Sequence, residues 1–290
     1  MKRLCVAIMT LVLASAAMSE TVSIYDIQYP PADANGLSPK HGQIVDCRGI
    51  VVYVTAFRKP KIILYDGIHP DGWGGIILKD WTFNLRGNPD IVPGNEILFQ
   101  NVEVEDFSGT TFLQYGKDGR SSSYSVIGTG NPLPEPVPVR VEELQAPVED
   151  PIDEWHIDNY DAEQYEGMFV KVIDVNVVSL DEGKALDNYA LVSNIAPNTC
   201  WAADFINEGF LVGKYHELVQ IGQGFCGITG FVEQYTAIDD GIFFDYYQII
   251  TTTSEDFVLE QIGDLNDDCA VDLVDYAILM EHWLKGTYRE

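Results

Sequence analysis

The chain has few basic residues: 17 lysines and arginines stand against 45 aspartates and glutamates, for a net charge of −28. Proteins bind nucleic acid largely through Lys and Arg that displace counterions from phosphates. This balance argues against a general DNA- or RNA-binding protein and disfavours nucleic acid as a partner. It fits a soluble acidic protein that binds divalent cations.

Long apolar segments are absent as well, since no run of about 18 uncharged apolar residues occurs. The strongest apolar run, Leu4–Leu13, follows Lys2 and Arg3 and precedes the small residues Ala14–Ala17. This order is typical of a secretory signal peptide, which we place at residues 1–19. We therefore expect a secreted, periplasmic or cell-surface protein without stable membrane insertion.

The sequence also lacks the common catalytic motifs. No Gly-x-Ser-x-Gly, phosphate-binding glycine loop or His-Glu-x-x-His occurs, and the five histidines are scattered. Paired carboxylates for glycoside hydrolysis are recognised by geometry, and nothing in the sequence selects two of the 45 acids. We predict no catalytic residue, and a polysaccharide-degrading enzyme such as a glycoside hydrolase, or its accessory subunit, stays as the alternative to a non-catalytic protein.

Cysteines are few, and the predicted signal peptide would remove one of the five. The remainder are Cys47, Cys200, Cys226 and Cys269, with no Cys-x-x-Cys spacing for a metal. An oxidising compartment favours a disulfide. Because Cys200 and Cys226 lie in the same predicted domain, we expect them to pair, although the sequence does not fix the connectivity.

Short apolar or alternating runs, separated by Gly, Pro, Asn and Asp, predict a first β domain at residues 20–130. Phe107–Thr110 has the composition of a hairpin turn, in which Gly109 would take a positive φ. The predicted strands are Ser23–Ile27, Gln43–Thr55, Lys61–Tyr65, Gly75–Trp81, Glu96–Glu105 and Thr110–Tyr115.

A proline-rich and acidic stretch, residues 131–165, predicts a linker with one short helix after Val141, and a second β domain follows at residues 166–259. Gly167–Val172 in this domain matches the glycine-led pattern of Gly49–Val54 in the first. Val232–Tyr235 likewise matches Val104–Phe107. These matches suggest an internal repeat, the alternative being two unrelated β segments.

Five or six strands with a long, bendable first strand favour a small closed Greek-key barrel. The fold class we predict is mainly β: two tandem OB-like barrels, with a β-sandwich that carries a carbohydrate-binding face as the alternative. The strand patterns resemble the OB-type domains of secreted bacterial proteins.

Residues 260–290 contain a loop with oxygen ligands at the spacing of a calcium-binding EF-hand loop. Cys269 stands at the sixth position, where glycine normally supplies a positive φ. Asp275 stands at the twelfth, where glutamate is usual. We predict calcium as the bound cofactor, ligated by Asp264, Asn266, Asp268, the Ala270 carbonyl, Asp272 and Asp275.

An amphipathic helix should follow this loop, because Tyr276, Leu279, Met280 and Trp283 have helical spacing. The loop and helix together resemble a single type I dockerin repeat, although dockerins usually carry two. The resemblance implies calcium binding and a cohesin-like or cell-surface protein partner in polysaccharide catabolism. It assigns Leu273 and Val274 to partner contact, unless they pack the start of the helix.

Three functional hypotheses follow. The first is an exported, calcium-binding, non-catalytic adaptor whose dockerin-like tail mediates attachment. The second is the polysaccharide-active enzyme or subunit, with carbohydrate bound by the β domains. The third is single-stranded nucleic-acid binding by the barrels, for which the basic candidates are Arg48, Arg58, Lys59, Lys61 and Lys79.

Two aromatic clusters could stack on sugar rings or bases if they are exposed, and otherwise they form core. They are Trp73, Trp81 and Phe83 in the first domain, and Phe243, Phe244, Tyr246 and Tyr247 in the second.

Overall fold

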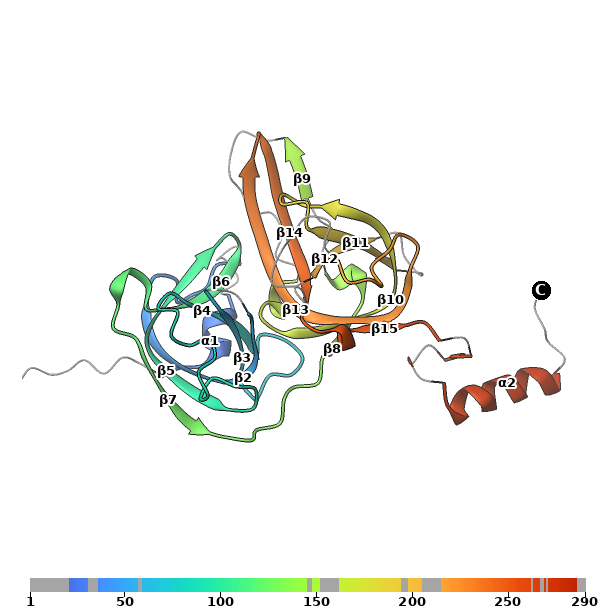
Figure 1. The fold of residues 1–290 in the computed structure, drawn as a ribbon, viewed down its shortest axis with the longest axis horizontal. Helices are drawn as coiled ribbons and strands as arrows, with labels where there is room; N and C mark the ends of the chain where they lie inside the picture. Colours follow the sequence, from blue (N-terminus) through green and yellow to red (C-terminus); the bar gives the residue numbers. More distant parts are fainter. Residues whose placement is uncertain are drawn as a thin grey trace, which may run out of the picture.

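The computed structural model describes residues 21–30, 36–56, 59–144, 148–151, 162–193, 198–204, 215–261, 263–266, 269 and 271–285. Within these ranges two β-barrels lie side by side, and a C-terminal helix lies apart from both (Figure 1). None of the described helices is long and apolar enough to cross a membrane. The predicted signal peptide, residues 1–19, lies outside the described residues.

The first barrel is a seven-stranded sheet whose five central strands close on themselves. Its strands follow the order β1-β2-β3-β4-β6-β5-β7, and β2 also pairs with β5 to close the barrel. β4 and β6 run parallel. The pairs β2–β3, β3–β4, β2–β5 and β5–β6 are antiparallel. The strands are β1 (Thr21–Val22), β2 (Ile44–Val54), β3 (Lys61–Tyr65), β4 (Gly75–Asp80), β5 (Glu96–Phe107), β6 (Thr110–Tyr115) and β7 (Ser123–Gly128).

The second barrel repeats this connectivity. Its central strands follow the order β13-β10-β11-β12-β14, with β13 pairing β14 to close the ring and β12 parallel to β14. The strands are β8 (Val137–Val139), β9 (Val148–Pro151), β10 (Phe169–Glu182), β11 (Asn188–Ser193), β12 (Thr199–Asp204), β13 (Gly224–Asp239), β14 (Ile242–Thr251) and β15 (Phe257–Leu259). The shared strand order confirms the internal repeat as a repeat of topology.

Each barrel is therefore a five-stranded closed Greek-key barrel of the OB type. Inward side chains alternate along the strands, as Ile62 and Leu64 do on β3, and fill the first core together with Phe99 and Leu113. The second core has the same construction around Tyr189 and Phe225. The predicted tandem OB-like fold is confirmed, and the alternative β-sandwich is wrong because both sheets close.

Two local predictions differ from the structure. The predicted strand Ser23–Ile27 is instead the helix α1 (Ile24–Gln28), because Ser23 accepts a hydrogen bond from the Asp26 N–H and caps it. Part of the predicted linker belongs to the second sheet, where β8 pairs with β10 and β9 pairs with β14. The short helix expected after Val141 is the 3-10 turn η2 (Val141–Glu143).

The barrels meet through an apolar contact on the outer face of the first one. Ile63 of β3, Ile77 of β4 and Phe112 of β6 point outward from the first barrel and are nearly fully buried. They pack against Phe231 of β13 and Ile250 of β14. The strands β3 and β4 are thus buried on both faces over their central residues.

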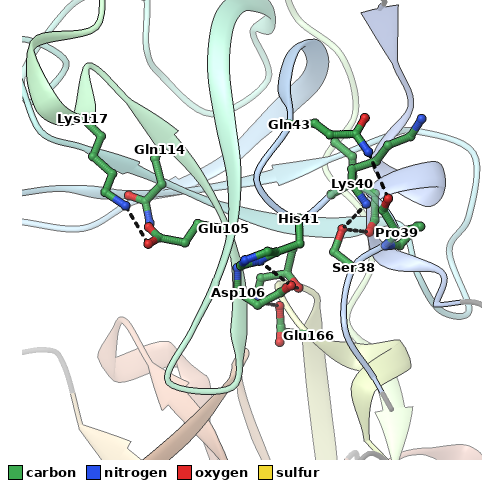
Figure 2. A network of polar contacts seen from close by, with 12 residues as sticks. Ser38, Pro39, Lys40, His41, Gln43, Glu105, Asp106, Gln114, Lys117 and Glu166 are labelled. Carbon is green, nitrogen blue, oxygen red and sulfur yellow. Dashed lines mark hydrogen bonds and ion pairs between the residues drawn. The ribbon is translucent and has the colours of Figure 1, made fainter. Parts of the chain in front are cut away.

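Beside this apolar contact lies a set of buried polar groups (Figure 2). The Glu166 carboxylate accepts a hydrogen bond from the Thr111 N–H at 2.7 Å, which links the second barrel to the first. Glu163, in the 3-10 turn η3 (Glu163–Tyr165), accepts one from the Tyr247 hydroxyl at 2.6 Å. Asp106 accepts one from the Thr111 hydroxyl. Their described hydrogen bonds include no lysine or arginine.

Asp106 also lies 2.9 Å from the His41 ring nitrogen, which favours its charged form if that histidine is protonated. Burial favours the neutral form of all three carboxyls. Desolvation raises the pKa of Glu163 to about 8, with smaller contributions from Asp106 and Asp245. Desolvation also raises the pKa of Glu166 well above its ordinary value, and the pKa of Asp106 rises for the same reason. At neutral pH this part of the interface therefore holds protons that the unfolded chain would release.

This difference predicts that the protein loses stability as the pH rises. An unfolded glutamate releases its proton near pH 4.5, whereas folded Glu163 keeps it until about pH 8, so the free energy of unfolding falls between these values. We expect Glu163→Gln to remove part of this slope and to raise Tm at pH 8. Thermal melts from pH 5 to 9 test this, with exposed Glu217→Gln as the control. An unchanged slope in Glu163→Gln would contradict the assignment.

Candidate ligand-binding site

Strands β3 and β4 and the adjoining loops form the face on which OB folds bind oligonucleotides and oligosaccharides. In this protein the second barrel covers the centre of that face through Phe231 and Ile250. One end of the face stays open as a groove of about 140 Å³, which is smaller than a typical small-molecule pocket and suits a single ring or group. We call it the lysine groove; it is lined by Lys61, Lys79, Phe107, Ser108, Phe112, Glu233, Gln234, Tyr235 and Gln248.

Lysines and aromatic rings alternate around Lys79, which lines this groove, while Lys59 and Trp81 lie beside the lining residues. The Lys59 ammonium lies 3.7 Å from the centroid of the Trp81 ring, and the Lys79 ammonium lies 5.5 Å from it. Lys79 is also 5.4 Å from the Phe107 ring and 5.2 Å from the Phe112 ring. These are cation–π distances, and they hold positive charge against flat apolar surfaces.

A chain of hydrogen bonds fixes the orientation of Trp81. Its indole N–H donates to Gln114, and the Gln114 amide donates to Glu105 at 2.8 Å. The Lys117 ammonium lies 2.6 Å from the other Glu105 oxygen. Figure 2 shows the Gln114, Glu105 and Lys117 part of this chain. The ring at the groove is therefore held in place before any ligand arrives.

The electrostatics at Lys79 come from Lys61 and Lys59, which lower its pKa, and from two carboxylates, Glu233 of the second barrel and Glu105 of β5, which raise it. Lys61 forms an ion pair with Glu233 at 2.5 Å, and both side chains are mostly buried. The pKa of Lys79 is lowered, chiefly by burial and then by the neighbouring charge of Lys61. An anionic group beside Lys79 would relieve this repulsion, so the groove favours a negatively charged ligand.

The hairpin turn between β5 and β6 forms one edge of the groove. Ser108 and Gly109 have φ values of 55° and 89°, as the sequence predicted for a tight turn with Gly109 in the left-handed region. A side chain at Gly109 would collide with Gln234, since a Cβ there would lie 2.6 Å from its side-chain oxygen. The turn is thus packed against β13, and Phe107, 55% exposed, projects from it.

Of the five basic candidates, the structure brings Lys59, Lys61 and Lys79 together. Arg48 is exposed on β2 and does not line the groove, and Arg58 lies outside the described residues. Strand alternation places Lys61 and Lys79 directly opposite each other in the antiparallel β3–β4 pair. The sequence could have predicted this opposite placement only if β3 and β4 were known to be neighbours.

The two predicted aromatic clusters differ in their exposure to solvent. Phe243, Phe244, Tyr246 and Tyr247 are all buried, so the hypothesis that this cluster is exposed to ligands is wrong. They are core because β14 is covered on both faces, by its own barrel and by the packing around Trp201. Trp81 and Trp73 are half-buried and Phe83 is exposed, which leaves the first cluster accessible.

The predicted calcium loop has hydrogen bonds between its side chains and its backbone. Asp264 accepts from the Cys269 N–H at 2.8 Å, and Asp275 accepts from the Leu265 and Asp272 N–H groups. These bonds lower the pKa of Asp275, the bond from Asp272 most of all. Cys269 has φ 71°, the conformation that the sixth loop position requires.

The structure describes only some of the other predicted calcium ligands. Asn266 is exposed, and Asp268 and Ala270 lie outside the described residues. Within the described part of the chain, no group of three or more His, Cys, Asp or Glu side chains is arranged to hold a metal ion. Calcium binding therefore stays a prediction from the sequence pattern.

The amphipathic helix predicted after the loop is α2 (Leu273–Lys285), and Asp272 caps it by accepting from the Val274 N–H. The helix lies apart from both barrels (Figure 1), and most of its described apolar side chains are exposed. Leu273 and Val274, the predicted partner contacts, are 82% and 51% exposed, so they do not pack the helix start. The predicted stripe of Tyr276, Leu279, Met280 and Trp283 is exposed too.

The predicted disulfide between Cys200 and Cys226 is wrong. Cys226 on β13 pairs with Cys269 of the loop, and Cys200 is a free, fully buried thiol, as is Cys47. The Cys200 side chain belongs to the barrel core, whereas Cys226, beside the core residue Phe225, points to the other face of its strand. Burial raises the pKa of the Cys47 and Cys200 thiols to about 12, which keeps them unreactive.

Comparison with known proteins gives similarities of fold. No protein-family model and no curated protein matches the chain. An OB domain from Methanosarcina mazei is 17% identical, covering 31% of this chain and 77% of that one, with a TM-score of 0.24. An OB domain from Thermoplasma acidophilum is 15% identical, covering 40% and 93%, with a TM-score of 0.25. A murine DNA-binding protein bound to double-stranded DNA is 9% identical, covering 71% and 92%, with a TM-score of 0.34.

Reduction of this disulfide should lower the thermal stability of the protein. A cross-link across 43 residues removes entropy from the unfolded chain that corresponds to about 4 kcal/mol. We expect a Cys226→Ser/Cys269→Ser variant to melt several degrees below the wild type, and a reductant to lower the Tm of the wild type but not of this variant. Differential scanning calorimetry with and without reductant measures this. Cys47→Ala/Cys200→Ala serves as the control, because it should retain the response to reductant.

Proposed function

We propose that the protein is a binding protein whose first OB barrel takes a short single strand of nucleic acid in the lysine groove. The observation that carries this proposal is the position of Lys59 and Lys79 over the Trp81 ring, beside Phe107 and Phe112. Proteins that bind single strands combine backbone-tracking positive charge with aromatic rings on which bases stack. Both elements meet here on the face that OB folds use for ligands.

The roles follow from the contacts. Trp81 is held at the groove by its hydrogen bond to Gln114 and would stack on one base. Lys59 and Lys79 would move from the ring to phosphates, whereas Lys61 would stay with Glu233. Because two lysines serve phosphates within a chain of net charge −28, we expect weak binding that salt reduces further.

A titration of labelled oligothymidylate tests this proposal. Two phosphate contacts on a single strand give a slope of log K against log salt of roughly −1.4. Replacing both lysines, in Lys59→Gln/Lys79→Gln, should bring this slope close to zero. Loss of one stacked base, in Trp81→Ala, should cost about 1–3 kcal/mol of binding free energy.

The matched controls remove the same charge or an aromatic ring elsewhere. Arg86→Gln/Lys184→Gln lowers the net charge equally but leaves the groove intact, and Trp283→Ala removes an exposed ring on α2. Fluorescence anisotropy at several salt concentrations, with circular dichroism to check folding, compares the variants. Equal weakening in both charge pairs would show only a general field effect and would overturn the assignment of the groove.

The C-terminal unit is the second candidate. We propose that residues 264–275 bind one calcium ion and that the helix α2 supplies a surface for association with another protein of the exported environment. Oxygen-bearing residues at the ligand positions support the first part, together with the positive φ of Cys269. The exposure of Leu273, Val274 and Trp283 supports the second.

Calorimetric titration of calcium into the full chain tests the ion site. We expect one ion per chain with a dissociation constant of about 10⁻⁴–10⁻³ M, the range of extracellular modules. Asp264→Ala removes the first ligand and should abolish the heat of binding. Asp239→Ala, an exposed acid at the β13–β14 turn, should not. Absence of calcium uptake by the wild type at millimolar concentration would dismiss the site.

A further inference from the structure

A second place where aromatic rings gather lies outside the lysine groove, along helix α1. Tyr25 stacks on His69 at 4.4 Å and on Tyr29 at 5.1 Å between ring centroids. Trp73 meets Tyr29 edge to face at 5.3 Å. Two of these rings come from α1 and its end, and two from the hairpin between β3 and β4. The proposed nucleic-acid site uses none of them.

The hairpin holds its two rings in a fixed position. Asp66 accepts hydrogen bonds from the Ile68 and His69 N–H groups, at 2.8 and 2.9 Å, and its other oxygen contacts the His69 ring nitrogen. The backbone N–H of Trp73 donates to the backbone carbonyl of Gln164 at 2.7 Å, so the segment before the second barrel anchors the Trp73 end of the hairpin. Trp73 has φ 65°, a left-handed conformation that is uncommon for a large side chain. The ring stack is therefore arranged in advance of any ligand.

A cavity of about 470 Å³ lies against the stack, within the size range of small-molecule sites. We call it the tyrosine pocket; it is lined by Thr21, Val22, Tyr25, Asp26, Tyr29, Pro39 and Lys40. Tyr29, 49% exposed, offers the most accessible ring surface of the stack, because Tyr25 lies between two other rings.

The polar groups of the tyrosine pocket suit hydroxyl groups better than ions. Asp26 can only accept hydrogen bonds, Lys40 can only donate them, and the Thr21 hydroxyl does both. One acid and one base leave the pocket close to neutral, while the chain as a whole carries −28 and repels anions. A sugar ring matches this set, because its hydroxyls donate and accept while its C–H face packs on the electron-rich face of an aromatic ring.

We propose that the tyrosine pocket binds one ring of a neutral oligosaccharide, with Tyr29 as the stacking residue and Asp26 and Lys40 as hydrogen-bonding partners. This site is separate in residues and in ligand charge from the lysine groove. Its failure or success therefore leaves the nucleic-acid proposal untouched.

Isothermal titration of the full chain with cellohexaose and xylohexaose tests the proposal, with saturation-transfer NMR to identify the contacting ligand protons. We expect binding at millimolar concentration that Tyr29→Ala weakens at least roughly fivefold, the scale of one lost ring contact. Tyr29→Phe keeps the ring and should bind as the wild type does. Asp26→Asn should weaken binding while Trp81→Ala, in the lysine groove, leaves it unchanged.

Two further arms use anionic probes, a hexamer of galacturonic acid and an oligothymidylate. Weaker Tyr29-dependent binding of both than of the neutral sugars supports the proposal. Stronger binding of either one, dependent on Tyr29, would overturn it in favour of an anion site. Equal affinity of the wild type and Tyr29→Ala for cellohexaose, with circular dichroism showing that both are folded, would mean that the rings only pack α1 against the barrel.

Discussion

The contact between the two barrels determines most of what the rest of the molecule can do. Ile63, Ile77 and Phe112 stand at outward positions of the first barrel, where an isolated OB fold would expose them to ligand or solvent. Phe231 and Ile250 of the second barrel bury them instead. The face of β3 and β4 is thereby left open at one end only, and the second barrel becomes a wall of the remaining groove.

The same contact separates two electrostatic environments. On one side, burial favours the neutral form of Glu163 and Glu166 and raises the pKa of Asp106. On the other side, Lys59 and Lys79 lie over aromatic rings at the surface. An acidic protein can thus hold a local basic site, because burial favours the protonated form of Glu163 and Glu166, and Glu233 is paired with Lys61.

Local patterns predicted the strands well, since alternation of apolar and polar residues is a property of neighbouring positions. The same patterns did not predict which segments are buried on both faces, or a helix that depends on its N-terminal cap. Ser23 turns an apolar segment into the start of α1, and no alternation reveals that. The lysine groove could be predicted only in part: the residues were visible as basic candidates, but their meeting depends on the pairing of β3 with β4 and on where the second barrel sits.

The disulfide shows the same limit. Cys200 and Cys226 are near in sequence, yet they face opposite sides of the barrel wall, and this is decided by the register of the strands. Cys269 lies in a separate unit, and only the path of the chain after β15 brings it to β13. The calcium loop was the most specific motif of the sequence. The spacing of its ligands can be seen in the sequence, but whether they surround an ion depends on the folded conformation of the loop.

The bond between Cys226 and Cys269 also changes what a cut in the chain would do. In the connection from β15 to the loop, residues 260, 261 and 263 are exposed and would be open to proteases. A single cleavage there leaves the loop and α2 joined to the second barrel through sulfur. Whatever α2 binds would stay attached to the barrels after such damage, until a reductant released both together.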